Sequence, residues 1–429
     1  MPSVKPSRLR LCDRAALAIL VLWTVYDATA VNLFGPKPAG ERSVDYHLLY
    51  QYSHTVVSSH HYPPWYPYPP PSIVLQYISA LPPITIAVHI YLVLTIAAAL
   101  ACWLLLRQML FDSDGRPGWA ILLPAVFASN YFVQWDLRSQ NCNILVLACL
   151  LLGMRELQLG KPAQSGLWLS AGIALKVYPV VLIPYLLWKR EHAALAWLLA
   201  FSAVMWLVLP MIAFTPRGAA DVYAGWFAQM ANAAHALTLS PRHPILISLQ
   251  RSAETLLPGR ASWILNGARL AWAGLLFAGL DASRRRGAPR REASHASAAG
   301  STRMAKADCI GMLTDVSLLL LAPIALSPYL EPYHEAPFAL AAALLVDAGT
   351  DVTLTARWRA AAWLTLALSY LAIAVRTPFA VRGLAVNIEL FIALAGLLAI
   401  SRHRTPLCSD RPPEQQAPAA TPVPEAPRA

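Results

Sequence analysis

Charged side chains are scarce in this sequence. Only 13% of its 429 residues are Asp, Glu, Lys or Arg, whereas 57% are hydrophobic. About 25% are charged in a typical soluble globular domain. A soluble chain of this length would need the missing charge to cover its surface, so the composition predicts that lipid is the main solvent. The function is therefore expected in the few polar segments.

The sequence also lacks the usual patterns of metal and nucleotide sites. Its six cysteines show neither metal-type spacing nor a pair within one loop, so no zinc site or disulfide framework is expected. It has no Gly-rich phosphate loop. The net charge of +11 comes from short basic flanks of apolar runs. This placement is typical of membrane orientation signals and argues against a nucleic-acid partner.

Apolar runs recur along the chain and predict an all-α fold, a polytopic transmembrane helical bundle of about 10–13 spans. Some runs are short or interrupted by proline, which indicates broken helices buried in protein around a polar cavity. The candidate spans are 15–34, 83–106, 118–133, 142–154, 163–175, 177–188, 193–214, 262–280, 309–326, 336–347, 358–375 and 383–400.

The positive-inside rule orients these spans. We expect a cytoplasmic N-terminus (1–14), one transmembrane domain (15–405) and a disordered cytoplasmic tail (406–429). Within the domain, 35–82 is the first outer loop, 215–261 is a large outer loop, and 281–308 is a basic cytoplasmic loop. The segment 134–141 is expected to be a short outer loop.

The first outer loop carries a carboxylate and an aromatic run. Asp45 lies soon after the first span, and prolines at 63–71 alternate with Trp65, Tyr66 and Tyr68. Prolines at this density favour an extended polyproline-type course, and aromatic rings can stack on sugars. The alternatives are a solvated Asp45 paired with Arg42, and an interfacial aromatic belt. Asp27, inside the first span, is a second functional candidate or a residue reaching interfacial water.

Cations and further polar groups are expected on the same face. Arg138 lies in 134–141, and Lys176 interrupts the apolar run at 171–187. Lys176 either snorkels to the interface or neutralises an anion. With Arg138 nearby, the anion is expected to be a phosphate, which needs convergent donors. The segment 327–335 adds carboxylates, tyrosines and a histidine, so we expect it to line the same site.

The order of these motifs resembles the GT-C superfamily of membrane glycosyltransferases. It is most similar to the bacterial polyprenol-phosphate-mannose-dependent α-1,2-mannosyltransferase-like family. The resemblance covers most of positions 14–400, although Ser139 replaces the family's usual glycine. The matching elements are Asp45, Tyr66-Pro67-Tyr68-Pro69-Pro70, Ser139-Gln140-Asn141-Cys142-Asn143, Lys176-Val177-Tyr178-Pro179, and Ser327-Pro328 to His334.

The resemblance implies a polyprenyl-phosphate-linked sugar as donor, with mannose the expected hexose, and a glycolipid or polysaccharide as acceptor. It also implies a multi-pass protein of the bacterial inner membrane with its site facing outside. We expect no cofactor, and the sequence does not decide whether a metal is needed. Asp45 would be the catalytic base. The donor phosphate would be bound by Lys176, Arg138 and His334. The sugar and acceptor would be bound by Tyr66, Tyr68, Gln140, Asn141, Tyr333 and Glu335.

A secondary transporter or flippase for a lipid-linked or anionic substrate is the main alternative, because it would share the spans and the broken helices. A transporter should show paired halves and charges buried within its spans. This chain instead concentrates its polar residues in the predicted outer loops. A scaffold protein without catalysis would not need the Asp, Lys and His residues gathered there.

Overall fold

The structure is a computed structural model that describes residues 6–34, 44–63, 68–111, 118–239, 306–325 and 337–374, with Gly267 and Gly396. These residues are mostly helical and form no strand, as the sequence predicts. The helices are α1 (Pro6–Phe34), α3 (Val44–Ser59), α4 (Pro70–Ser79), α5 (Ile84–Leu110), α6 (Gly118–Ser139), α7 (Asn143–Gln158), α8 (Pro162–Leu175), η2 (Tyr178–Val181), α9 (Leu182–Trp188), α10 (His192–Ala203), η3 (Val204–Val208), α11 (Leu209–Leu239), α14 (Lys306–Ala325), α15 (Phe338–Thr350) and α16 (Ala356–Ala374).

Two of the described helices are long and apolar enough to cross a membrane. One is Ile84–Leu110, and the other is the continuous helical stretch His192–Ala231. A third crossing results if Phe132–Ser139 and Asn143–Gln158, which meet at an angle of 117°, form one broken span. The larger number of predicted spans is not reached within the described ranges. Several predicted spans instead form shorter apolar helices, such as Phe338–Thr350.

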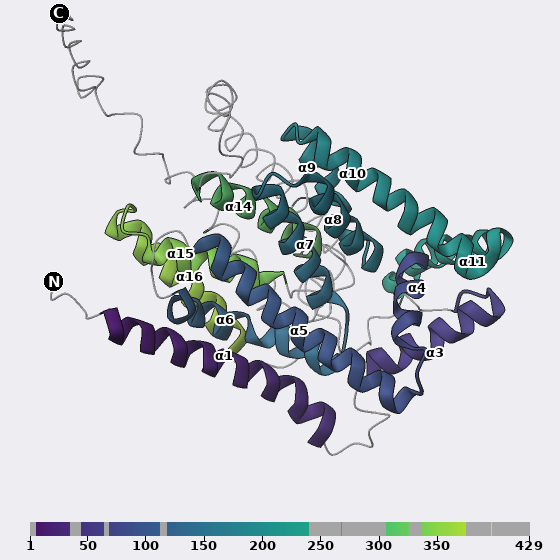
Figure 1. The fold of residues 1–429 in the computed structure, drawn as a ribbon, viewed down its shortest axis with the longest axis horizontal. Coiled ribbons are helices and arrows are strands. Elements are labelled where there is room, and N and C mark those ends of the chain that lie inside the picture. The colour runs from purple at the N-terminus through teal and green to yellow at the C-terminus, as the bar shows by residue number, and fades with distance from the viewer. Residues whose placement is uncertain are drawn as a thin grey trace, which may run out of the picture.

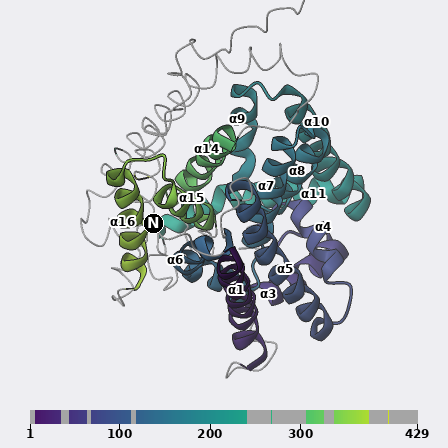
Figure 2. The same ribbon diagram turned by 60° about the vertical axis from the view of Figure 1, so that its left-hand side comes forward.

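The buried side chains form two cores. Figure 1 shows α3, α4 and α11 on one side of the molecule and α1, α6, α15 and α16 on the other, and Figure 2 shows the same helices turned by 60°. The larger core joins α1, α5–α10 and α14–α16, and its fully buried side chains include Trp103 and Phe132. The smaller core joins α3, α4, the start of α5 and the first half of α11 around Tyr46, Phe214 and Trp226. Because Cys142, at the start of α7, belongs to the smaller core, the α6–α7 connection lies where the two cores meet.

The predicted first outer loop (35–82) contains two helices rather than only extended chain. Pro69 is extended, but Pro70 and Pro71 occupy the first positions of α4. Proline suits these positions because its missing N–H would have no helical partner there. Tyr62 packs against Gly225 of α11, where an added Cβ would lie 2.6 Å from the Tyr62 Cβ. The polar segment is therefore folded onto α11.

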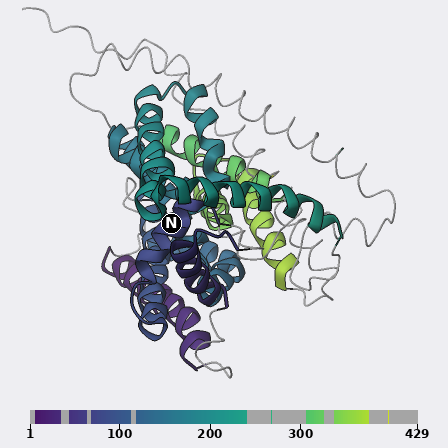
Figure 3. The same ribbon diagram turned by 90° about the vertical axis from the view of Figure 1, so that its right-hand side faces the viewer.

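The predicted large outer loop (215–261) is helical at least as far as Leu239. Helix α11 passes Thr215, whose φ of 62° and ψ of 160° break the helical path, and then continues from Pro216. Proline at the first position of the resumed helix needs no N–H partner. Figure 3 shows this long helix in side view. The remainder of that loop, the basic loop 281–305 and the tail lie outside the described residues.

Candidate active site

Asp45 lies in the first turn of α3 and is partly buried. Its Oδ2 accepts a hydrogen bond of 2.9 Å from Asn141 Nδ2, 96 positions further along the chain. Burial raises the pKa of the Asp45 carboxyl above its usual value. The Asn141 hydrogen bond and the positive charge of Lys176 lower the pKa in part. The carboxylate is thus fixed in place and made more basic than an exposed one.

Tyr68, two residues before α4, supports the same asparagine. Its hydroxyl donates to Asn141 Oδ1 over 3.1 Å. The Tyr62 hydroxyl in turn donates to the Tyr68 carbonyl. Both tyrosines are buried, so the structure shows Tyr68 as part of the support for Asp45 rather than as an exposed ring. Its predicted sugar contact stays a prediction.

The sharp turn between α6 and α7 holds Asn141. Helix α6 continues to Ser139, so most of the predicted 134–141 loop is helical. Asp136, fully buried, accepts hydrogen bonds of 2.8 Å from the Ile144 N–H and from Asn143 Nδ2. A carboxylate is stabilised at the first turn of a helix, because the N–H groups there have no partner within the helix. Asp136 therefore caps α7.

Lys176 ends α8 in an extended conformation, just before the η2 turn that contains Pro179. Its ammonium lies over the Tyr68 ring, 5.3 Å from the ring centroid. Such an arrangement is an attractive cation–π contact. The charge of Lys176 also lowers the pKa of Asp45. Tyr68, which Lys176 covers, contacts the asparagine that binds Asp45. The cation and the carboxylate therefore belong to one site. Four of the residues predicted from sequence are thus brought together.

Arg138 and Gln140 take other partners. The Arg138 guanidinium lies 4.0 Å from Asp27 of α1, which also accepts a 2.7 Å hydrogen bond from Gln134. Gln140 is fully buried and donates to the Val88 carbonyl in α5 over 3.4 Å. Neither contact points to phosphate or sugar, and their predicted binding roles stay untested.

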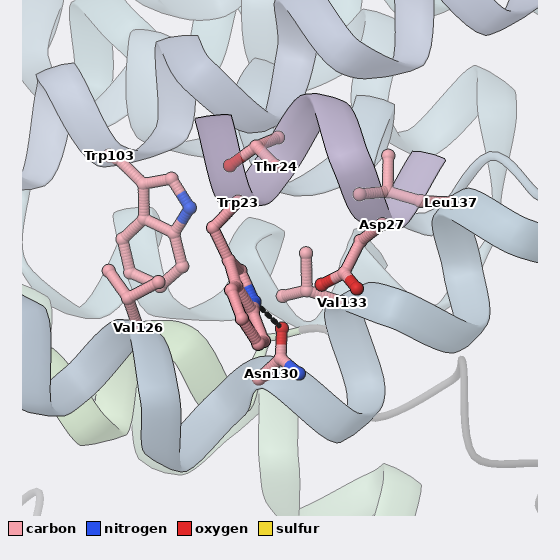
Figure 4. Close-up of a pocket in the computed structure, with 8 residues that line it drawn as sticks. All are labelled: Trp23, Thr24, Asp27, Trp103, Val126, Asn130, Val133 and Leu137. Atoms are coloured by element: carbon pink, nitrogen blue, oxygen red, sulfur yellow. Dashed lines mark hydrogen bonds between the residues drawn. The ribbon is translucent and has the colours of Figure 1, made fainter. Parts of the chain in front are cut away.

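Asp27 lines a small cavity between α1, α5 and α6. Figure 4 shows Trp103 and Val126 on one side of it and Asp27 and Leu137 on the other. A 2.8 Å hydrogen bond from Trp23 Nε1 to Asn130 Oδ1 lies between them. Asp27 is only 2% exposed, so it is a buried, hydrogen-bonded carboxylate rather than a residue in interfacial water.

Other predicted site residues lie where the structure is not described: Tyr66, Tyr333, His334 and Glu335. In the described part of the chain, no three His, Cys, Asp or Glu side chains are grouped to hold a metal ion. The support that sequence analysis missed is the Asp136–Asn143 pair. Its signal was two asparagines at the start of an apolar run with an aspartate seven positions earlier.

A known protein family matches the chain. The model of the protein family described as Glycosyltransferase family 87 matches residues 66–305, more than half of the chain. The matched segment includes Tyr68, Asn141 and Lys176 but begins after Asp45. No curated protein and no solved structure matches the chain.

Proposed function

The chain belongs to glycosyltransferase family 87, and from this premise we propose that it uses a lipid-linked sugar. The donor would be a polyprenyl-phosphate hexose, with mannose expected, and the acceptor a hydroxyl of a glycolipid or glycan. The reaction would take place at the outer face of a bacterial inner membrane, which the protein crosses several times. Its apolar helices and the topology from basic flanks support this placement.

One observation carries the proposal: a fixed carboxylate and a cation are linked through a buried tyrosine and asparagine. Asp45 is bound by Asn141, Tyr68 joins Asn141, and Lys176 covers Tyr68. Transfer from a sugar phosphate needs both charges. A base must remove the acceptor proton, and a cation must stabilise the phosphate that leaves.

In the proposed reaction, Asp45 takes the proton of the acceptor hydroxyl. The acceptor oxygen bonds to the anomeric carbon as the bond from that carbon to the phosphate oxygen breaks. The electron pair leaves with the polyprenyl phosphate, and Lys176 stabilises the added negative charge. A single carboxylate opposite the leaving group is sufficient for transfer with inversion. Membership of a glycosyltransferase family disfavours the transporter or flippase alternative.

A donor panel tests this proposal. The purified protein in lipid nanodiscs would receive radiolabelled polyprenyl-phosphate mannose or glucose, or GDP-mannose or UDP-glucose, with octyl α-mannoside as acceptor. We expect transfer from a polyprenyl-phosphate sugar and none from the nucleotide sugars. Transfer from a nucleotide sugar alone would overturn the proposed donor class. Mass spectrometry of envelope glycolipids and polysaccharides from a deletion strain would show which hexose is missing.

A further inference from the structure

The side-chain amide of Asn141 has only one possible orientation. The backbone N–H of Cys142 can only donate, and it lies 2.7 Å from Asn141 Oδ1. Asn143 Nδ2, at 3.0 Å, and the Tyr68 hydroxyl donate to the same oxygen. Turning the amide over would set its N–H groups against a backbone N–H. Its nitrogen must therefore face Asp45.

The residue beside Asn141 is oriented as well. Asn143 Nδ2 donates both to Asn141 Oδ1 and to Asp136 Oδ1, at 3.0 and 2.8 Å. If the Asn143 amide turned over, its oxygen would face the Asp136 carboxylate, which is held by the Ile144 N–H of α7. The first turn of α7 thus fixes Asp136, Asp136 fixes Asn143, and Asn143 helps to fix Asn141. The donor and the acceptor are therefore defined in each hydrogen bond of this series.

The direction matters for Asp45. Among the described residues, Asn141 is the side chain that hydrogen-bonds to this carboxylate, and it does so at Oδ2. An oxygen that already accepts an N–H is less able to accept a proton, because part of its electron density is engaged. We propose that Asn141 is a positioning residue for glycosyl transfer, whose fixed amide holds Oδ2 and reserves Oδ1 for the acceptor's proton. This inference rests on the proposed function, in which Asp45 is the base.

Two substitutions at Asn141 test the proposal through the pH profile of kcat/KM, measured with the donor that the wild-type protein uses. Asn141→Leu removes the N–H, so Asp45 should become harder to ionise and the acidic limb should move up by about one pH unit or more. Asn141→Asp places a second carboxylate against Asp45 and should move the limb further, because two neighbouring carboxylates resist joint ionisation. Asn130→Leu, which removes an amide that binds Trp23 instead, should leave the limb in place.

The exchange variant Asp45→Asn/Asn141→Asp separates positioning from folding. It retains an amide and a carboxylate at hydrogen-bond distance, so its melting temperature should be closer to that of the wild type than the melting temperature of Asn141→Asp alone. Transfer should stay lost, since the carboxylate is then on the wrong side of the pair. An exchange variant that transfers normally would overturn the positioning role, as would an Asn141→Leu protein whose acidic limb is unchanged.

A measurement without catalysis keeps the two proposals distinguishable. The pKa of Asp45 is raised on folding, so its contribution to stability falls as the pH rises through that pKa. Asn141→Leu should steepen the fall of the melting temperature as the pH rises above the ordinary pKa of an aspartate. The added substitution Asp45→Asn should abolish the extra slope. If Asp45→Asn transfers normally while this slope behaves as expected, the base assignment fails but the hydrogen bond stands.

Discussion

The Lys176 ammonium lies over the ring of Tyr68, 5.3 Å from its centroid. The tyrosine is buried, and its hydroxyl reaches the asparagine that holds Asp45. A lysine that only snorkelled to the membrane interface would turn its ammonium toward water and away from the buried polar groups. The contact therefore favours the alternative to snorkelling, in which Lys176 binds an anion close to the Asp45 carboxylate.

Replacing Lys176 with glutamine should weaken donor binding. A hydrogen bond between a charged lysine and phosphate contributes about 1.5–3 kcal/mol, so we expect the Kd for a polyprenyl phosphate to rise about 10- to 100-fold. Lys161→Gln is the matched control, because Lys161 precedes the other end of the same helix and pairs with Glu156 at 3.4 Å. Titration of both proteins in nanodiscs measures the difference. Equal affinities would mean that Lys176 does not bind the phosphate.

The acidic limb of activity should lie above the pH at which an ordinary aspartate titrates. Burial raises the pKa of Asp45, and below that pKa the residue holds a proton and cannot act as a base. Lys176 lowers this pKa in part, so Lys176→Gln should move the limb to still higher pH. The pH dependence of kcat/KM is the measurement. A limb that moves down in Lys176→Gln, or moves equally in Lys161→Gln, would contradict the assignment.

Arg138 should stabilise the protein through Asp27. Their side chains lie 4.0 Å apart, with Asp27 almost fully buried and Arg138 partly exposed. In a double-mutant cycle of Arg138→Gln and Asp27→Asn, we expect a coupling of about 1 kcal/mol in the free energy of unfolding. If the two substitutions change the free energy of unfolding additively, Arg138 and Asp27 do not stabilise the protein through each other. Donor titrations of the same variants test the predicted phosphate contact, since an unchanged Kd in Arg138→Gln would confine Arg138 to this structural role.

Sequence reasoning selected four residues that the structure brings together, but it did not predict the contacts between them. The residues selected were Asp45, Tyr68, Asn141 and Lys176. They stand out because polar residues beside apolar runs of a membrane protein are rare and often functional. That Asn141 binds Asp45 could not be predicted, because it depends on the 117° turn after α6. That turn is held by Asp136 of α6, which accepts hydrogen bonds from Asn143 and Ile144 at the start of α7. These residues are only seven and eight positions apart, but the cap depends on the turn between the two helices and leaves no periodic pattern.

The helices were predicted where apolar runs are long and missed where polarity interrupts them. Helix α5 follows the predicted span 83–106 closely. Helix α3 was missed because its polar residues, including His47 and His54, resemble a loop in a membrane protein. His54 is accommodated by a 2.8 Å hydrogen bond to the Ala80 carbonyl and by ring contacts with Tyr50 and Tyr77. Tertiary contacts thus decide its fold where composition does not.

The membrane orientation can be tested with single cysteines in a background without the six native ones. A membrane-impermeant maleimide added from outside should label Ser43→Cys, Ser139→Cys and Ser327→Cys. Ser294→Cys, in the basic loop, should be labelled only after the membrane is permeabilised, because basic loops remain cytoplasmic. Labelling of Ser294→Cys in intact cells would reverse the orientation and place the proposed site on the cytoplasmic side.

Asp45→Asn should abolish most of the transfer while donor binding persists. The amide keeps the shape of the carboxylate, and its oxygen can still accept the Asn141 N–H, so the fold around α3 should survive. What is lost is basicity, and a general base typically contributes about 10²- to 10⁴-fold to the rate. Single-turnover transfer and donor titration of the same sample separate the two effects. Because Lys176 is intact in this variant, the Kd for the donor should stay near that of the wild type.

The other carboxylates that could act as the base are Asp136, Glu331 and Glu335, and each should be amidated in parallel. Asp136→Asn is expected to lower both activity and melting temperature, because it weakens the cap of α7 and the orientation of Asn143. Asp45→Asn should lower activity with little change in melting temperature, and that contrast distinguishes a base from a support. If Asp45→Asn retains transfer and Glu331→Gln or Glu335→Gln loses it, the base lies in the segment 327–335. If all four variants retain transfer, no carboxylate is the base, and the acceptor must be activated in another way.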